Sequence, residues 1–333
     1  MITLGIETSC DETSAAVYSP ESGIMSSEIF SQVHLHTKFG GVVPEVASRN
    51  HALKVRKIVE SAVEKSNVSL IDIDLIGVTS SPGLIGALFV GVSFAKGLSY
   101  ALKKPVVPVN HLTAHILSAE IENIDLTPPY ASLVISGGHT HIYLVTKSYN
   151  FKLISRTIDD AIGETFDKVA KALGFGYPGG PFIESEAKTG DKNKIDFPIP
   201  MKNDLNFSFS GLKTSVINEY KTYKHTKSDI AASFQKVAVD TLLYKVNLAY
   251  KKFRFDKLVV AGGVACNSYL RERFLNELPS IRVFFPSNAL CTDNGAMVAY
   301  AANKLYFKRV FMGFRGKALD RDEHIKLFWY QLL

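Results

Sequence analysis

The chain has 333 residues, of which 46% are apolar and 21% charged, with a formal net charge of +6 and an isoelectric point near 9.0. This length and apolar content suffice for two hydrophobic cores and exclude a disordered or low-complexity protein. Three widely spaced cysteines without a CxxC pair exclude a disulfide framework and favour a cytoplasmic protein. The basic surplus is compatible with a polyanionic partner but does not prove one.

The first third of the chain predicts a meander of three strands followed by alternating helices and strands. Apolar runs bounded by turn residues predict strands at residues 2–7, 14–18, 24–31, 75–80 and 105–110, and the first of these predicts a strand rather than a signal peptide. A helix is predicted from about residue 45. Residues 84–102 are nearly long enough to span a bilayer, but Lys96 interrupts the run. We therefore expect a helix buried between layers, with no transmembrane segment and no membrane partner.

The same order of elements returns from residue 130. Strands are predicted at residues 130–136, 140–146, 151–157, 257–262 and 282–286, and helices from about residue 161 and at 211–219, 230–251, 267–278 and 294–306. Residues 174–209 are dense in Gly, Pro, Asn and Asp and predict a loop insertion. We predict an α/β fold of two duplicated lobes with a cleft between them. The first lobe comprises residues 1–109 plus 295–333, and the second comprises 110–294.

Two turns occupy equivalent places in the two halves, ETSCDETS at residues 7–14 and SGGHT at residues 136–140. In such tight turns, backbone N–H groups can converge on an anion. Each is also an ordinary hairpin turn when considered singly, but their pairing favours the phosphates of a nucleotide. A third element, VVAGGVACN, joins a strand to a helix, where Asn267 is predicted either to bind a ribose or base or to cap the helix.

The segment NHLTAH places His111 and His115 four residues apart, so that on a helix both imidazoles lie on one face and can share a metal. Asp293, in CTDNGAM, is the carboxylate we add to complete a site of two histidines and one carboxylate with open positions. The spacing alone is also typical of surface or core histidines. A zinc peptidase would need Glu beside the first histidine, and residues 112 and 113 are Leu and Thr. The segment therefore lacks the general base that a zinc peptidase requires.

Other polar residues have a structural explanation beside a functional one. The acids of residues 159–167 are predicted to bind a ligand hydroxyl or to favour the start of a helix. Ser210 and Lys213, in FSFSGLKT, predict an anion site or an ordinary helix cap. Four histidines that alternate on strand-like segments are predicted to be structural or to support a site, namely His34, His36, His139 and His141.

Nine segments together resemble the TsaD family of tRNA N6-adenosine threonylcarbamoyltransferases, also known as Gcp, YgjD, Kae or Qri and formerly as O-sialoglycoprotein endopeptidases. These segments are GIETSCDETSAAV, SQVHLHTKFGGVVPEVASRNH, SSPGLIGALFVG, HLTAH, SGGHT, DDAIGETFDKVAKALGFGYPGGP, FSFSGLKT, AGGVACN and CTDNGAMVAYA. They occur in order from residue 1 to about 306, and ETSCDETS is similar to the bacterial branch. The tail after residue 306 departs from the resemblance.

The resemblance implies an actin-like and sugar-kinase-like (ASKHA) fold of two ribonuclease-H-type lobes. It implies transfer of a threonylcarbamoyl group from threonylcarbamoyl-AMP to N6 of adenosine 37, just 3′ of the anticodon, in tRNAs that read ANN codons. The product is N6-threonylcarbamoyladenosine. Implied partners are tRNA, a TsaB-like paralogue and a TsaE-like ATPase. Implied cofactors are one divalent metal per subunit, Fe²⁺ ahead of Zn²⁺, and an adenylate, either threonylcarbamoyl-AMP or an ATP-like nucleotide.

Carried over residue by residue, the resemblance makes His111, His115 and Asp293 the metal ligands. The implied substrate-binding residues are Val134, Ile135, Ser136, Gly137, Gly138, Asp167, Gly180, Glu184 and Asn267. Position 184 is Glu here, where many relatives have Asp. The general base is not identified, and its candidates by position in the turns are Asp11, Glu12 and His139.

Two rival functions use the same features. One is an ATP-hydrolysing or sugar-phosphorylating enzyme on the same scaffold, and the other is a binding module that uses a nucleotide as a switch. The histidine pair argues against the kinase, because such enzymes hold Mg²⁺ with oxygen ligands. Metal binding together with tRNA-dependent turnover would exclude the binding module.

Overall fold

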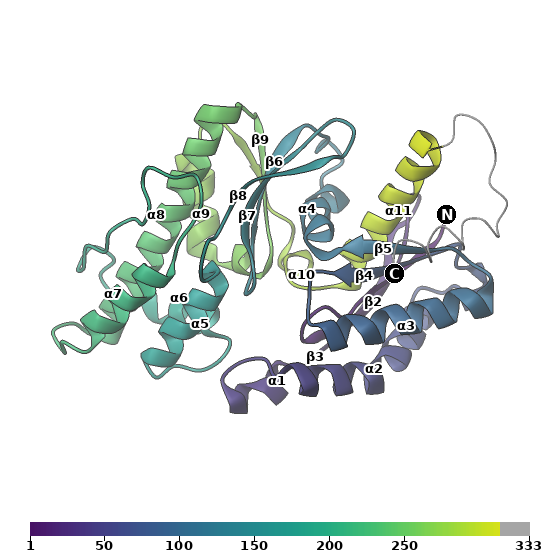
Figure 1. The fold of residues 1–333 in the computed structure, drawn as a ribbon, viewed down its shortest axis with the longest axis horizontal. Helices are drawn as coiled ribbons and strands as arrows, with labels where there is room; N and C mark the ends of the chain where they lie inside the picture. The colour runs from purple at the N-terminus through teal and green to yellow at the C-terminus, as the bar shows by residue number, and fades with distance from the viewer. Residues whose placement is uncertain (314–333) are drawn as a thin grey trace. The chain divides into compact units, whose positions relative to one another are not determined.

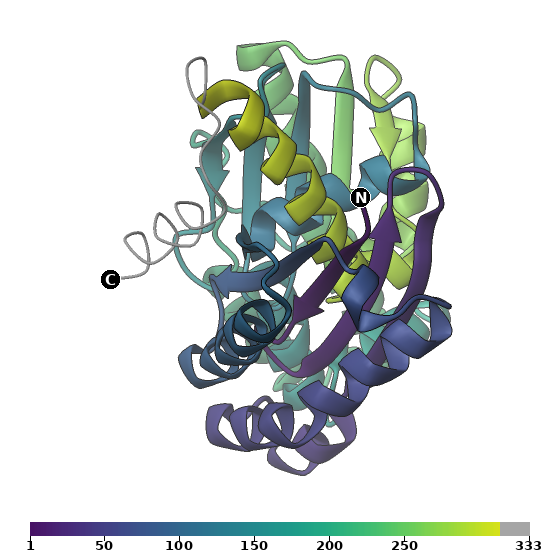
Figure 2. The same cartoon turned by 90° about the vertical axis from the view of Figure 1, so that its right-hand side faces the viewer.

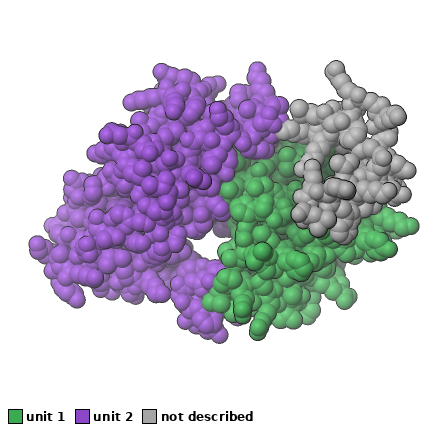
Figure 3. Space-filling model, viewed as in Figure 1, with its two compact units in different colours: residues 1–32, 43–117, 293–333 green, residues 33–42, 118–292 purple. Residues whose placement is uncertain are grey.

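The computed structural model describes residues 1–313 and contains two five-stranded mixed sheets (Figure 1). By packing, the chain divides into two compact units (Figure 3). Among the described residues, unit 1 comprises 1–32, 43–117 and 293–313, and unit 2 comprises 33–42 and 118–292. Residues 314–333, which the sequence assigned to the first lobe, lie outside the described residues. The lobe boundaries proposed from the sequence stay a prediction.

The sheet of unit 1 has the strand order β3-β2-β1-β4-β5. Its first three strands form an antiparallel meander, and the last two run parallel to β1. The strands are β1 (Thr3–Glu7), β2 (Glu12–Ser19), β3 (Gly23–Ser31), β4 (Leu75–Ser81) and β5 (Val106–Asn110). The helices that cover this sheet or extend from it are α2 (Pro44–Lys65), α3 (Ile85–Leu102), α4 (His111–Glu122) and α11 (Gly295–Gly313).

The sheet of unit 2 has the order β10-β9-β6-β7-β8, so β6 takes the place that β1 has in unit 1. Its strands are β6 (Tyr130–Ile135), β7 (Thr140–Val145), β8 (Phe151–Arg156), β9 (Lys257–Ala261) and β10 (Arg282–Phe284). The helices are α1 (Val33–His36), α5 (Ile162–Ala172), α6 (Gly179–Ala187), α7 (Ser210–Tyr220), α8 (Lys227–Phe253), α9 (Ser268–Glu277) and α10 (Asn288–Cys291). Read from its other edge, this sheet has the order β8-β7-β6-β9-β10, which matches β3-β2-β1-β4-β5 strand for strand. The identical strand order confirms the duplicated α/β architecture that the sequence predicted.

A pair of glycines lets α11 lie directly on the sheet of unit 1. Gly5 of β1 and Gly77 of β4 are partners in the parallel register. A Cβ added to Gly5 would lie 2.2 Å from the Gly295 carbonyl oxygen, and one added to Gly77 would lie 2.4 Å from the Ala302 Cβ. Figure 2 shows the yellow helix α11, which packs against β1 and β4. This close packing fixes the start of α11, which Asp293 precedes by two residues.

The prediction that residues 84–102 form a helix buried between layers is wrong for one face of that helix. α3 packs its small residues Ala87, Gly91 and Ala95 inward, whereas Ile85 is 88% exposed and Phe89 is 71% exposed. By length and composition, α3 is the one described helix that could cross a membrane. It is also the crossover between the parallel strands β4 and β5 and packs against α2 and β4. Small inward residues let a helix approach its neighbours closely without burying its large apolar side chains.

Two further local predictions are wrong. His34 and His36 lie in the short helix α1 rather than on a strand, because four alternating residues fit either structure. The predicted loop insertion at residues 174–209 contains the helix α6. Its Gly-Gly-Pro start resembled a turn in the sequence, yet proline is tolerated in the first turn of a helix, where its missing N–H leaves no bond unmade.

Candidate metal centre and nucleotide-binding turns

The candidate metal ligands gather at the carboxyl ends of the parallel strands of unit 1. His111 is the first residue of α4 and directly follows β5. His115 lies one helical turn further along, so both imidazoles share a face of the helix. In open α/β sheets, ligands bind outside the carboxyl ends of the strands, because loops and helix starts converge there.

These three side chains approach one another closely. The His115 Nε2 lies 3.1 Å from the Asp293 Oδ1, and the His111 Nε2 lies 3.5 Å from the same oxygen. One ligand atom from each residue lies within 4.8 Å of the others. Both imidazoles are buried, whereas the Asp293 carboxylate is partly accessible. The structure therefore brings together the histidine pair that was predicted from spacing and the Asp293 carboxylate that was added to it.

The donor set fits a borderline transition metal. Two imidazole nitrogens and one carboxylate oxygen are the ligands of Zn²⁺ sites and of the two-histidine, one-carboxylate Fe²⁺ sites that keep open positions. A Mg²⁺ site would use oxygen ligands and would not require the histidines. Among the described residues, this is the one cluster of three such groups with this geometry.

Glu7, which the sequence analysis did not single out, contacts the ring nitrogen of His111 that faces away from Asp293. Its Oε2 accepts hydrogen bonds from the His111 Nδ1 at 3.1 Å and from the Thr79 hydroxyl at 2.6 Å. Burial raises the pKa of Glu7, but the charge and hydrogen bond of His111 outweigh it and leave this pKa below its usual range. The feature of the sequence that could have indicated Glu7 is an acidic residue at the end of a strand that is otherwise apolar and entirely buried.

His111 is held in an acidic environment. Burial lowers the pKa of its imidazole, but the carboxylates of Asp293 and Glu7 outweigh burial and raise this pKa to about 9. A cation that binds His111 near neutral pH must therefore displace a proton from the ring.

The acidic turn after β1 supplies two of the candidate general bases, Asp11 and Glu12. Asp11 is buried. Burial, followed by the charges of Asp11 and Asp293, raises the pKa of Glu12 to about 10. A raised pKa argues against Glu12 as a base at neutral pH. The third candidate, His139, lies in the hairpin turn of unit 2, where its backbone N–H donates to the Ser136 Oγ.

The predicted phosphate turn of unit 2 is a closed hairpin. The Ser136 N–H donates to the His139 carbonyl at 2.8 Å, while Gly137 and Gly138 between them are exposed. Val134 and Ile135 are fully buried in β6, so they can offer a ligand only their backbone. An added Cβ at either glycine would meet nothing within 4 Å, so no side chain covers this turn.

The second glycine turn of unit 2 lies against the first. Gly262 follows β9 with a φ of +97°, and a Cβ there would lie 2.4 Å from the Ile135 carbonyl oxygen. Because β6 and β9 are parallel neighbours, both turns leave the same edge of the sheet. The positive φ and the close approach together require glycine.

Asn267 ends this turn with its side chain engaged inside the protein. Its Oδ1 accepts from the Leu270 N–H at 2.8 Å, which caps α9, and its Nδ2 donates to the Gln235 Oε1 at 2.8 Å. Gln235 is a second residue that the sequence analysis missed, and a polar side chain on the buried face of α8 was its signal. The capping role predicted for Asn267 is confirmed.

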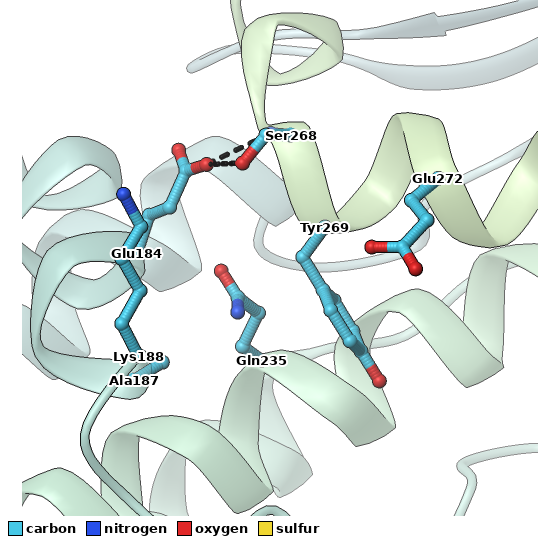
Figure 4. Close-up of a pocket in the computed structure, with 7 residues that line it drawn as sticks. All are labelled: Glu184, Ala187, Lys188, Gln235, Ser268, Tyr269 and Glu272. Atoms are coloured by element: carbon cyan, nitrogen blue, oxygen red, sulfur yellow. Dashed lines mark hydrogen bonds between the residues drawn. The ribbon is translucent and has the colours of Figure 1, made fainter.

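The remaining predicted contacts lie around the start of α6. The Asp167 Oδ1 accepts from the Gly179 N–H at 2.6 Å and so orders the turn that exposes the neighbouring Gly180. Glu184, further along α6, accepts from the backbone N–H and the hydroxyl of Ser268. A cavity of about 250 Å³ lies beside this contact (Figure 4). It is lined by Glu184, Ala187, Lys188, Gln235, Ser268, Tyr269 and Glu272.

The acids after β8 serve the fold. The Asp159 carboxylate accepts from the backbone N–H groups of Phe209 and Ser210, so it caps α7 in place of the Ser210 side chain. The Asp160 carboxylate pairs with Lys168 and Lys213. The Lys213 charge is thereby neutralised, and the predicted anion site at this helix start is already occupied by the protein's own carboxylates.

The two sheets of identical strand order define an ASKHA-type protein. The same fold occurs in component A of the Acidaminococcus fermentans (R)-2-hydroxyglutaryl-CoA dehydratase, with a TM-score of 0.59, 15% identity and coverage of 92% of this chain and 99% of that one. It also occurs in T. kodakarensis HypF, with a TM-score of 0.66, 15% identity and coverage of 92% of this chain and 48% of that one. At such low identity, these likenesses establish the fold alone.

The family follows from the sequence. The family model of TsaD, the tRNA N6-adenosine threonylcarbamoyltransferase, matches residues 23–300. A protein of that name from Thermosipho africanus is 50% identical over 93% of this chain and 96% of its own length. Another from Sulfurihydrogenibium sp. is 48% identical over 96% of both chains. The chain belongs to the TsaD family.

Proposed function

We propose that this chain transfers the threonylcarbamoyl group of threonylcarbamoyl-AMP to N6 of adenosine 37 in tRNA, at the centre formed by His111, His115 and Asp293. Relatives that match nearly its whole length carry the name of this transferase. The observation that carries the proposal is the convergence of two buried imidazoles and one accessible carboxylate. The metal is Fe²⁺ in preference to Zn²⁺, one per subunit.

The chemistry needs help at two points, because an exocyclic adenine amine is a weak nucleophile and AMP must leave with its charge. A bound divalent cation supplies a Lewis acid for the carbamoyl carbonyl. The histidines would hold such a cation through neutral nitrogens, and Asp293 would contribute a single negative charge. A divalent ion on this trio would therefore keep a net positive charge.

The turns of unit 2 are suited to the adenylate. Gly137 and Gly138 are exposed and have no side chain, so we propose that the backbone N–H groups of this turn donate to phosphate oxygens. The start of α6 at Gly180, held by Asp167, and the Glu184 and Asn267 region around the cavity are proposed to bind the nucleoside. None of these contacts requires the side chains of Val134 or Ile135, which are buried.

The charge distribution supports tRNA binding by unit 2. Within residues 1–313, unit 2 has 23 Lys and Arg against 18 Asp and Glu, whereas unit 1 has 11 of each. Contacts from Lys and Arg to the phosphate backbone dominate nucleic-acid affinity. We further propose a TsaB-like paralogue and a TsaE-like ATPase as partners and the cytoplasm as the compartment, as the family resemblance implies.

The test is the nucleoside content of tRNA from cells depleted of their own enzyme, measured by mass spectrometry. Wild-type chain, His111→Ala and the control His225→Ala are returned separately. We expect N6-threonylcarbamoyladenosine to be restored by the wild type and by the control, with a loss of transfer rate on the order of a hundredfold for His111→Ala. Full restoration by His111→Ala would remove the metal centre from the proposal. No restoration by the wild type would favour a kinase or a nucleotide-switched binding module.

A further inference from the structure

We propose that Glu7 is a positioning residue that presents the His111 Nε2 to the metal. The proposal rests on the metal centre proposed above and adds a residue that is not among its ligands. Glu7 is fully buried at the end of β1, and His111 is the first residue after β5. Glu7 therefore ends, and His111 directly follows, a strand in the parallel part of the sheet.

The surroundings of Glu7 consist of hydrogen-bond donors. Its Oε1 accepts from the backbone N–H of Ser9, and its Oε2 accepts from the Thr79 hydroxyl at 2.6 Å and from the His111 ring at 3.1 Å. A carboxylate is acceptor-only and meets all three donors. The Ser9 N–H cannot rotate away as a side chain could, because it belongs to the backbone of the turn two residues after Glu7.

This arrangement determines the tautomer of His111. A nitrogen that faces an acceptor-only carboxylate must carry the hydrogen, so Nδ1 is protonated and the lone pair of the neutral ring is on Nε2. The Nε2 is the atom that lies 3.5 Å from the Asp293 Oδ1. The Ser9 Oγ, 3.2 Å from Nδ1, can accept a share of the same hydrogen. Carboxylate partners fix metal-binding histidines in this manner.

A glutamine at position 7 cannot reproduce these bonds in either orientation. If its oxygen faces His111, its NH₂ group meets the Ser9 N–H, and two donors oppose each other. If its NH₂ group faces His111, Nδ1 must become the acceptor and the hydrogen moves to Nε2. That nitrogen then has no lone pair for a metal. The carboxylate, and not merely a polar side chain of this size, is required.

The experiment measures Zn²⁺ and Co²⁺ affinity of the full chain by competition with a chromophoric chelator at neutral pH. Glu7→Gln is compared with the wild type and with Glu28→Gln, a matched substitution on β3 whose carboxylate pairs with Lys65. We expect Glu7→Gln to weaken binding by roughly 10- to 100-fold and Glu28→Gln to leave it unchanged. Equal affinities for Glu7→Gln and the wild type would overturn the role of Glu7. A wild type that binds neither ion would instead overturn the metal centre itself.

A second readout does not depend on how well Glu7→Gln folds. In the Zn²⁺-loaded wild type, ¹⁵N NMR of the histidine side chains should show a hydrogen on the His111 Nδ1. A His111 Nδ1 without a hydrogen would contradict the proposal.

Thr79→Val removes one donor to Glu7 but keeps the bond to His111, so we expect it to reduce Zn²⁺ affinity less than Glu7→Gln does.

Discussion

The two units use the equivalent edge of two sheets with the same strand order in opposite ways. In unit 1, Glu7 is the last residue of β1 and His111 directly follows β5, so these strands end at the candidate metal centre. In unit 2, the equivalent strand β6 and its neighbour β9 end in glycine turns. The first site is made of imidazole and carboxylate groups, and the second is made of backbone. A side-chain site is destroyed when atoms are removed, whereas a backbone site is destroyed when atoms are added.

The largest effect is expected from truncation in unit 1. His115→Ala should abolish metal binding and lower the transfer rate by about a thousandfold, because both the ligand and the electrostatic stabilisation disappear. Metal content by mass spectrometry and single-turnover kinetics measure the two losses. Thr113→Ala on the same helix is the control and should retain both. Metal binding by His115→Ala at wild-type affinity would contradict the assignment.

In unit 2, the added methyl group of Gly262→Ala should cost about 3 kcal/mol of the free energy of unfolding. The φ of +97° and the 2.4 Å approach to the Ile135 carbonyl leave no room for a Cβ. Urea unfolding followed by circular dichroism measures the loss. Gly263→Ala, where a Cβ meets nothing within 4 Å, should be nearly neutral for stability. Equal stability of the two variants would mean that the turns are not packed as described.

A smaller effect should separate binding from folding in the same unit. Gly137 is exposed and has open space for a Cβ, so Gly137→Ala should unfold at the wild-type temperature. If its N–H approaches phosphate, the methyl group should lower affinity for AMP by about tenfold, or 1.4 kcal/mol. Isothermal titration calorimetry measures this affinity. Unchanged AMP binding would remove this turn from the nucleotide site.

The smallest effect concerns the ion pairs that join Asp160 to α5 and α7 in unit 2. Burial raises the pKa of Asp160, but hydrogen bonds from Lys213 and Lys168 outweigh it and hold this pKa below its usual range. A lowered folded-state pKa stabilises the protein above the unfolded value, and the contribution is lost as pH falls through the folded value. Asp160→Asn should therefore cost about 1 kcal/mol at pH 7, with a difference that shrinks below about pH 4. Thermal unfolding across this range gives the result, and a difference that grows in acid would contradict the sign.

The sequence was most informative where a periodic pattern coincided with distinctive chemistry. The spacing of His111 and His115 predicted that they share a helix face, and the duplicated strand pattern predicted the repeated sheet, since both depend on local geometry. Glu7 was missed because its importance arises from contact with a residue about a hundred positions away in the chain. The exposed face of α3 was missed because apolar residues on a helix do not reveal which of them a neighbouring helix leaves uncovered. The sequence predicted a glycine turn at position 262. It could not predict the positive φ, because that conformation depends on how β6 packs beside β9.

The metal centre itself is tested most directly by anomalous X-ray diffraction from crystals of the chain prepared with Fe²⁺ or Zn²⁺, collected on both sides of the absorption edge of that metal. The account predicts one anomalous peak in unit 1, roughly 2.0–2.2 Å from the His111 Nε2, the His115 Nε2 and an Asp293 carboxylate oxygen. A peak held by other residues, or none in crystals whose protein binds the metal in solution, would contradict it.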